Sequence, residues 1–160
     1  MKTFVSALAA AMVLAASSAF AQAPNGQFGI GLALGTGSGA QFTYAINPNV
    51  HIGARLGFQS TSVSGASQSV FVFGPFFRYL LTTSGVTPYL LGEFEYASQS
   101  TGGASTSTTS LFLGGGVGYY WNATFGVRGE IYLLNLGLDP SSTTFSIVPA
   151  RIGIDWFFGR

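Results

Sequence analysis

The chain has 160 residues, no cysteine and a formal net charge of +1, and only 7% of its residues are charged against 48% that are hydrophobic. A soluble globular domain carries about 25% charged residues, so this composition argues against an ordinary water-facing surface. The lack of cysteine excludes a disulfide framework and a thiolate metal site.

The first residues predict a leader that is removed from the mature protein. Met1 to Thr3 is a short basic start, Phe4 to Ala16 is apolar and rich in alanine, and Ala19-Phe20-Ala21 is a small-x-small cleavage site. This order is typical of a secretory signal peptide. The apolar stretch is shorter than the ~20 residues of a spanning helix, which argues against a membrane anchor. We therefore expect a signal peptide over residues 1–21 and one exported domain over residues 22–160.

The chain is hydrophobic without containing a long hydrophobic run. Its mean hydropathy is +0.43, yet no stretch of about 18 apolar residues follows the leader to make a spanning helix. Backbone polar groups inside lipid must all be paired, and only helices and closed β-barrels achieve that. The composition therefore favours a strand-based membrane structure.

Alternation of apolar with small or polar residues marks eight segments, and each has one apolar face. In chain order they are Gln27–Gly35, Ala40–Ile46, Val50–Gln59, Val70–Leu81, Pro88–Ala97, Leu111–Trp121, Phe125–Leu136 and Thr144–Phe158. Most approach or exceed the ~9–11 residues with which a tilted strand crosses a bilayer. Pro75 and Pro149 each remove a ladder donor, so we expect a bulge or a bend at both positions.

Short and long connections alternate between these segments. The short ones are Asn47–Asn49, Thr82–Val86 and Asn122–Thr124, and the longer ones, rich in Ser, Thr and Gly, are Ser60–Ser69, Ser98–Ser110 and Gly137–Thr143. Short periplasmic turns and long extracellular loops are typical of outer-membrane barrels. We expect the long segments to be flexible polar loops, and both chain ends to lie at the periplasmic rim. Thr36–Gly39 is a short connection on the long-loop side, predicted as a tight glycine turn.

Every charged residue inside the predicted strands falls on the small or polar face. These residues are Arg55, Arg78, Glu93, Glu95, Arg128, Glu130, Arg151 and Asp155, four positive and four negative. The interior of an eight-stranded barrel is just wide enough to be filled by side chains. Isolated charges there are costly, whereas paired ones are tolerated. We predict that these residues form a neutral ionic network in the lumen, while the apolar face meets lipid. Inward glycines leave room for a narrow conductance.

This pattern resembles the small eight-stranded outer-membrane barrels, the OmpA-like, OmpX-like and opacity-type proteins of the "outer membrane protein β-barrel domain" kind. The resemblance covers the whole mature chain. It implies an all-β, antiparallel, up-and-down transmembrane barrel in the cell outer membrane of a Gram-negative bacterium. Ile154, Trp156 and Phe158 look like the C-terminal signal that the barrel-assembly machinery reads, although Gly159 and Arg160 follow the aromatic residue. Outward aromatic residues near the periplasmic rim fit an interfacial girdle: Phe28, Tyr44, Tyr79, Tyr119, Trp121, Phe125 and Trp156.

Three classes of function fit the sequence. The favoured class is a non-enzymatic membrane barrel with a structural, surface-interaction or minor-permeability role. The second is a lipid A-modifying enzyme, but the only histidine, His51, follows a short turn and has no serine beside it. The third is a secreted lipocalin-like barrel, which would turn its apolar face inward. We expect no cofactor, no metal and no catalytic residue. The expected partners are outer-membrane lipid and lipopolysaccharide, the assembly machinery during biogenesis, and a host or matrix ligand bound through the loops, with no nucleic acid.

Overall fold

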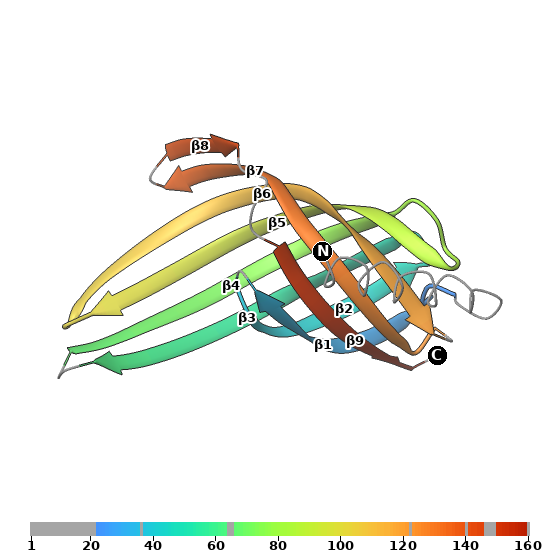
Figure 1. Cartoon of the computed structure of the whole chain (residues 1–160), viewed down its shortest axis with the longest axis horizontal. Helices are drawn as coiled ribbons and strands as arrows, with labels where there is room; N and C mark the ends of the chain where they lie inside the picture. The colour runs from blue at the N-terminus through green and yellow to red at the C-terminus, as the bar shows by residue number, and fades with distance from the viewer. Residues whose placement is uncertain are drawn as a thin grey trace, which may run out of the picture.

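The computed structural model describes residues 22–35, 37–63, 66–121, 123–139, 141–145 and 150–159, and the predicted leader lies outside them. Every regular element in this part of the chain is a β-strand (Figure 1). The strands are β1 (Gln27–Gly35), β2 (Gly39–Asn47), β3 (Val50–Val63), β4 (Ala66–Leu80), β5 (Val86–Thr101), β6 (Ala104–Trp121), β7 (Phe125–Asp139), β8 (Ser141–Phe145) and β9 (Ala150–Phe158). No helix among the described residues is long and apolar enough to cross a membrane.

The strands form one closed antiparallel sheet. Each strand from β1 to β7 pairs with the next one in sequence, and β9 pairs with β7 on one side and with β1 on the other. The short strand β8 pairs with β7 alone, so the ring has eight members. The predicted eight-stranded up-and-down barrel is therefore confirmed. β1 begins beside the end of β9, where Phe28 pairs with Phe158, so the barrel starts and finishes at the same end.

The last predicted strand, Thr144–Phe158, is divided in the structure. β8 ends at Phe145 and β9 begins at Ala150, and the residues between them, including Pro149, lie outside the described part. β8 pairs with the second half of β7, from Leu134 to Leu138, whereas β9 pairs with its first half, from Phe125 to Ile131. Both segments lie along the same edge of β7, and their register shifts by about two residues between Leu134 opposite Phe145 and Ile131 opposite Ala150, so the predicted strand is interrupted there.

The long connections are paired hairpins, and the prediction of flexible loops was wrong for Ser60–Ser69 and Ser98–Ser110. β3 and β4 stay in register from Val50 opposite Tyr79 to Val63 opposite Ala66. β5 and β6 stay paired up to Thr101 opposite Ala104. Gly102 and Gly103 between them both have positive φ, at 58° and 89°, which suits a two-residue hairpin turn. Because Thr favours strands and no Pro interrupts these segments, the ladder continues beyond the barrel wall (Figure 1).

Two ends can now be defined. The short-turn end carries the turns near residues 48–49, 81–85 and 123–124, and the long-strand end carries the extended β3–β4 and β5–β6 hairpins. At the long-strand end the β1–β2 connection is the tight turn expected from its glycines, closed by hydrogen bonds between Gly35 and the Ser38 hydroxyl. At the short-turn end Ala123 has a positive φ of 57°.

Two local features of the ladder differ from the sequence pattern. Pro75 causes no bulge, because β4 keeps one register on both sides of it, and only the bridges to β5 at Gly74 and Pro75 are missing. The register of β6 with β7 instead shifts between Leu113 and Gly114, where Leu133 has no partner opposite it. This bulge turns Asn135, opposite Phe112, to the same face as Tyr132.

The apolar face of the sheet points outward. The exposed large apolar side chains come from every strand of the barrel wall and include Leu32, Phe42, Leu56, Phe77, Leu90, Val117, Ile131 and Trp156. Of the predicted aromatic girdle, Phe28, Tyr79, Phe125 and Trp156 are exposed, whereas Tyr119 is buried and stacks edge-on against Trp121, with ring centroids 4.9 Å apart. A surface of this kind suits lipid and not water.

Candidate functional site

The interior of the barrel holds a cluster of buried charges contributed by five strands. Fully buried are Arg55 on β3, Arg78 on β4, Glu93 on β5, Arg128 and Glu130 on β7, and Arg151 and Asp155 on β9. The eighth predicted residue, Glu95 on β5, lies at the edge of the cluster, with 20% of its side chain exposed. All eight take part in the seven ion pairs of this cluster. We call this cluster, with its hydrogen-bonded neighbours Gln41, Tyr89 and Tyr132, the ion-pair network.

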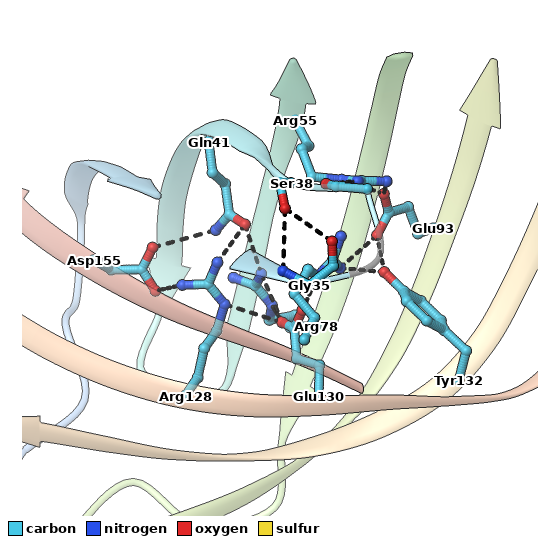
Figure 2. A network of polar contacts seen from close by, with 12 residues as sticks. Gly35, Ser38, Gln41, Arg55, Arg78, Glu93, Arg128, Glu130, Tyr132 and Asp155 are labelled. Carbon is cyan, nitrogen blue, oxygen red and sulfur yellow. Dashed lines mark hydrogen bonds and ion pairs between the residues drawn. The ribbon is translucent and has the colours of Figure 1, made fainter. Parts of the chain in front are cut away.

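Glu130 is the centre of the network. Its Oε1 accepts hydrogen bonds from Arg78 Nε at 3.0 Å, from Arg128 Nε at 3.1 Å and from the Tyr89 hydroxyl at 2.9 Å. Its Oε2 accepts one from Arg151 Nε at 2.7 Å. Four donors from β4, β5, β7 and β9 thus converge on one carboxylate. Figure 2 shows Arg78 and Arg128 beside Glu130. Burial of this charge is tolerable because several cations and hydrogen bonds surround it.

Glu93 is the second centre, and Arg151 connects it to the first. Arg151 Nη2 donates to Glu93 Oε2 at 2.7 Å while its Nε donates to Glu130. Arg55 donates to Glu93 Oε1, and the Tyr132 hydroxyl donates to Glu93 Oε2. The two carboxylates on β5 and β7 are therefore held together by an arginine from β9. The pair with Glu130 joins directly opposed residues of neighbouring strands, whereas the pair with Glu93 crosses the bore from β9 to β5.

Asp155 and Gln41 complete the network on the side of β2 and β9. Arg128 Nη1 pairs with Asp155 Oδ2, and Gln41 Nε2 donates to Asp155 Oδ1 at 3.3 Å. Gln41 Oε1 accepts from Arg128 Nη2 at 2.6 Å and from Arg78 Nη2 at 3.1 Å. Sequence reasoning named the charges and missed the neutral members Gln41, Tyr89 and Tyr132. The signal was present, because all three alternate with outward apolar neighbours.

At the long-strand end the network stops at Arg55. Its guanidinium pairs with Glu95 as well as Glu93, and it donates to the carbonyl of Gly37 in the β1–β2 turn. Beyond it lies a half-open cavity of about 560 Å³, lined by Glu95, by small or polar residues such as Gly37, Ser38 and Gln59, and by the apolar Phe58, Val70 and Val72. The bore is therefore open above Arg55 and filled below it.

Glycines on the inner face make room for the large interior side chains. A β-carbon at Gly153 would collide with the guanidinium of Arg128, one at Gly74 with the carboxylate of Glu93, and one at Gly31 with Asp155. Aromatic side chains use the same device: Phe157 lies over Gly29, Tyr89 over Gly116, Phe76 over Gly53 and Tyr120 over Gly126. At these positions the inner glycines are covered by neighbouring side chains and leave no gap.

His51 borders the network at Arg78, on the side of the short-turn end, and its ring nitrogens make no hydrogen bond with it. It is fully buried, and its ring centroid is 6.0 Å from that of Tyr120 and 5.8 Å from that of Phe157. Its antiparallel neighbours are Ala45 and Arg78, so no serine or carboxylate stands beside it in the sheet. Within the described residues no group of three or more His, Cys, Asp and Glu could hold a metal ion.

The residues that resemble an assembly signal are all on the outer surface of β9. Ile154, Trp156 and Phe158 are exposed by 46%, 61% and 50%, respectively. They pair with Leu32, Ile30 and Phe28 on β1, at the seam where the first and last strands close the barrel. Their role in assembly stays a prediction.

Comparison with known proteins gives the family of the chain. A family model described as "Outer membrane protein beta-barrel domain" matches residues 6–148. Among solved structures, the N-terminal β-barrel domain of Pseudomonas aeruginosa OprF is similar, with a TM-score of 0.57 and 15% sequence identity, over 82% of this chain and 96% of that chain. At this identity the likeness is one of fold alone. No curated protein sequence matches the chain. Because the family model covers most of its length, the chain belongs to the outer membrane protein β-barrel domain family.

Proposed function

We propose that this outer-membrane barrel is a non-enzymatic, structural membrane protein whose lumen is closed by the ion-pair network. The leader predicted over residues 1–21 directs export and is then removed. The short-turn end faces the periplasm, and the β3–β4 and β5–β6 hairpins extend from the cell surface. Its immediate partners are outer-membrane lipid and lipopolysaccharide.

The observation that carries this proposal is the convergence of Arg78, Arg128 and Arg151 on Glu130, with Arg78 reaching it from β4 across the bore. A passage for solutes would need water around these groups, but all four side chains are buried. General porins have about 16–18 strands around an aqueous channel, and this ring has eight. The side chains in the lumen are therefore better suited to holding the strands of the barrel together than to conducting ions or solutes.

The alternatives weighed from the sequence are less well supported. A lipocalin-like barrel would turn its apolar face inward, whereas this one exposes Leu32, Phe42 and Trp156 and buries arginines. A lipid A-modifying enzyme needs a catalytic group at the outer rim, whereas His51 is buried toward the short-turn end. The proposal therefore excludes catalysis by His51.

The test is ion conductance of the refolded chain, residues 22–160, in planar bilayers, with a general porin as positive control. Folding is checked first by the slower gel mobility of heated samples. We expect folded protein with no steady open channel. A stable conductance comparable to that of the porin in the folded parent would refute the closed lumen.

A surface-interaction role is a second candidate, favoured by the uncharged extended hairpins. No charged residue occurs from Gln59 to Phe77 or from Tyr96 to Trp121. Removing Ser98–Thr101 together with Ala104–Ser107 would leave the Gly102–Gly103 turn on the paired residues Ala97 and Thr108. If the hairpin binds a host or matrix ligand, cells with this shortened barrel should lose adhesion to matrix-coated surfaces while keeping the same amount of folded protein. Unchanged adhesion would exclude the β5–β6 hairpin.

A further inference from the structure

The residues that precede β1 form a short segment across the short-turn end of the barrel. We call Gln22–Gly26 the N-terminal strap. At its start Gln22 forms an isolated antiparallel bridge with Ser84, and Ala23 N donates to the carbonyl of Thr83 at 2.8 Å. At its end Gly26 N donates to the carbonyl of Ala45 at 2.7 Å. Both ends of the strap are therefore fixed to the barrel.

The two attachment points lie on different sides of the ring. Thr83 and Ser84 belong to the turn between β4 and β5, whereas the strap continues directly into β1. In a ring of eight, β1 and β5 stand opposite each other. Five extended residues reach about 17 Å, which is enough to pass over the narrow mouth of a small barrel. The strap therefore crosses the mouth and does not run along its rim.

The middle of the strap packs into the mouth. Ala23 is 2% exposed and Pro24 is fully buried, whereas Gln22 and Asn25 are exposed. Ala23 belongs to the same buried cluster as Ala45, Leu80, Tyr120 and Phe157. The backbone of Pro24 faces the imidazole of His51, whose two nitrogens make no hydrogen bond of good geometry within the described residues. The strap and these rings thus enclose His51.

We infer that the N-terminal strap is a second closure of the bore, separate from the ion-pair network, and that it keeps water and solutes away from His51. The inference depends on the proposed function in one respect only, namely that the short-turn end faces the periplasm. The strap covers His51 from the short-turn end, and the ion-pair network lies between His51 and the long-strand end. A solute entering from the short-turn end meets the strap first.

His51 is the only histidine of the chain and therefore reports on the strap by itself. The experiment measures carbethoxylation of His51 by diethyl pyrocarbonate, followed by peptide mass, in tag-free chain 22–160 refolded in lipid vesicles. The variant is Ala23→Asp, which places a carboxylate in the buried middle of the strap. The matched control is Asn25→Asp, which places the same charge two residues further on, at an exposed position.

We expect slow modification in the parent and in Asn25→Asp, and modification at least about tenfold faster in Ala23→Asp, because the rate follows the population of the open state. A second variant, lacking Gln22–Asn25, removes the strap without adding charge and should also react fast. Equal rates in parent, Ala23→Asp and the deletion would overturn the inference. If both altered chains fail to fold, the strap is part of the folding core, and the inference is equally overturned.

Conductance separates this inference from the closed lumen. With the ion-pair network intact, Ala23→Asp should expose His51 without opening a channel. A conducting parent whose His51 stays protected would refute the network as a closure and leave the strap standing. A parent that does not conduct but whose His51 reacts at the rate of free histidine would refute the strap as a closure and leave the ion-pair network standing.

Discussion

Arg128 and Glu130 stand two residues apart on β7, and both side chains point into the barrel, where Arg128 Nε donates to Glu130 Oε1 at 3.1 Å. The residue that follows them, Ile131, is 42% exposed on the outer face. Alternation along one strand therefore places a buried ion pair and a lipid-facing apolar residue next to each other. The same pair joins β4 and β9, because Arg78 and Arg151 also bind Glu130.

Adding a charge to the outer face of β7 should impair folding more than removing a charge from its inner face. Ile131→Arg places a charge in hydrocarbon, at a cost of about 2–4 kcal/mol near the midplane. Glu130→Gln keeps a hydrogen-bonding group of the same shape inside, and Arg151 and Arg128 keep Glu93 and Asp155 as partners. We expect Ile131→Arg to impair folding into vesicles clearly more, and Glu130→Gln to change mainly heat stability or a small conductance. The measurement is folded fraction against urea. Normal folding of Ile131→Arg with failure of Glu130→Gln would reverse the assignment of the faces.

Removal of Arg151 should destabilise the barrel more than removal of a surface charge. Arg151→Met leaves Glu93 and Glu130 short of a shared partner, and breaking a buried pair costs about 3–5 kcal/mol. Asp139→Asn is the control, since Asp139 is exposed at the end of β7, where surface changes stay within about 0.5 kcal/mol. Equilibrium unfolding in urea measures both. Equal stability of the two variants would mean that the network contributes little.

Gly153, which is buried on the inner face, and Gly129, which is exposed, together test whether an inner glycine is required by its neighbours. A β-carbon at Gly153 would meet the guanidinium of Arg128, whereas one at Gly129 would meet nothing within 4 Å. Gly153→Ala should destabilise the barrel by about 1–3 kcal/mol through overpacking. Gly129→Ala should be neutral or slightly stabilising, because it reduces the freedom of the unfolded chain without strain. Loss of stability in Gly129→Ala equal to that in Gly153→Ala would contradict this account.

Protease digestion of intact cells should report the topology. Because the β5–β6 hairpin is paired up to Thr101 and Ala104, we expect proteinase K to cut near Gly102–Gly103 and to spare the paired Ser/Thr segments. Asn47–Asn49 should be cut only after the outer membrane is opened. Fragment masses identify the sites. Cutting confined to the short turns of intact cells would mean that the barrel is inserted the other way round.

The aromatic residues of β9 offer a test of the assembly signal. Phe158→Ala should lower the amount of folded barrel in cells but leave folding into vesicles unchanged, if the assembly machinery reads this residue. Phe28→Ala is the matched control, because Phe28 is paired with Phe158 on β1 and is similarly exposed. Semi-native gels of membrane fractions compare the two. An equal loss in cells for both variants would show a general effect of removing an aromatic side chain at this rim.

The sequence by itself determined the face of most strand side chains, Asn135 beyond the bulge at Leu133 being an exception. Period-two alternation is a local property of strands, so the eight charges, the outward apolar residues and the closed barrel follow from the order of residues. The sequence did not reveal the long hairpins, because Ser and Thr suit loops and strands alike, and their pairing depends on the neighbouring strand. The expected bulge at Pro75 and the observed one at Leu133 differ for the same reason, since register belongs to two strands together.

Only the tertiary structure decided which charges meet. Arg151 and Glu93 are 58 positions apart, and Arg128 reaches Gln41 across 87. These partners are set by the tilt and stagger with which the ring closes, and no local pattern encodes that geometry. The strap depends on closure in the same way, because Ala23 becomes buried only when β1 and the β4–β5 turn stand on different sides of one narrow mouth.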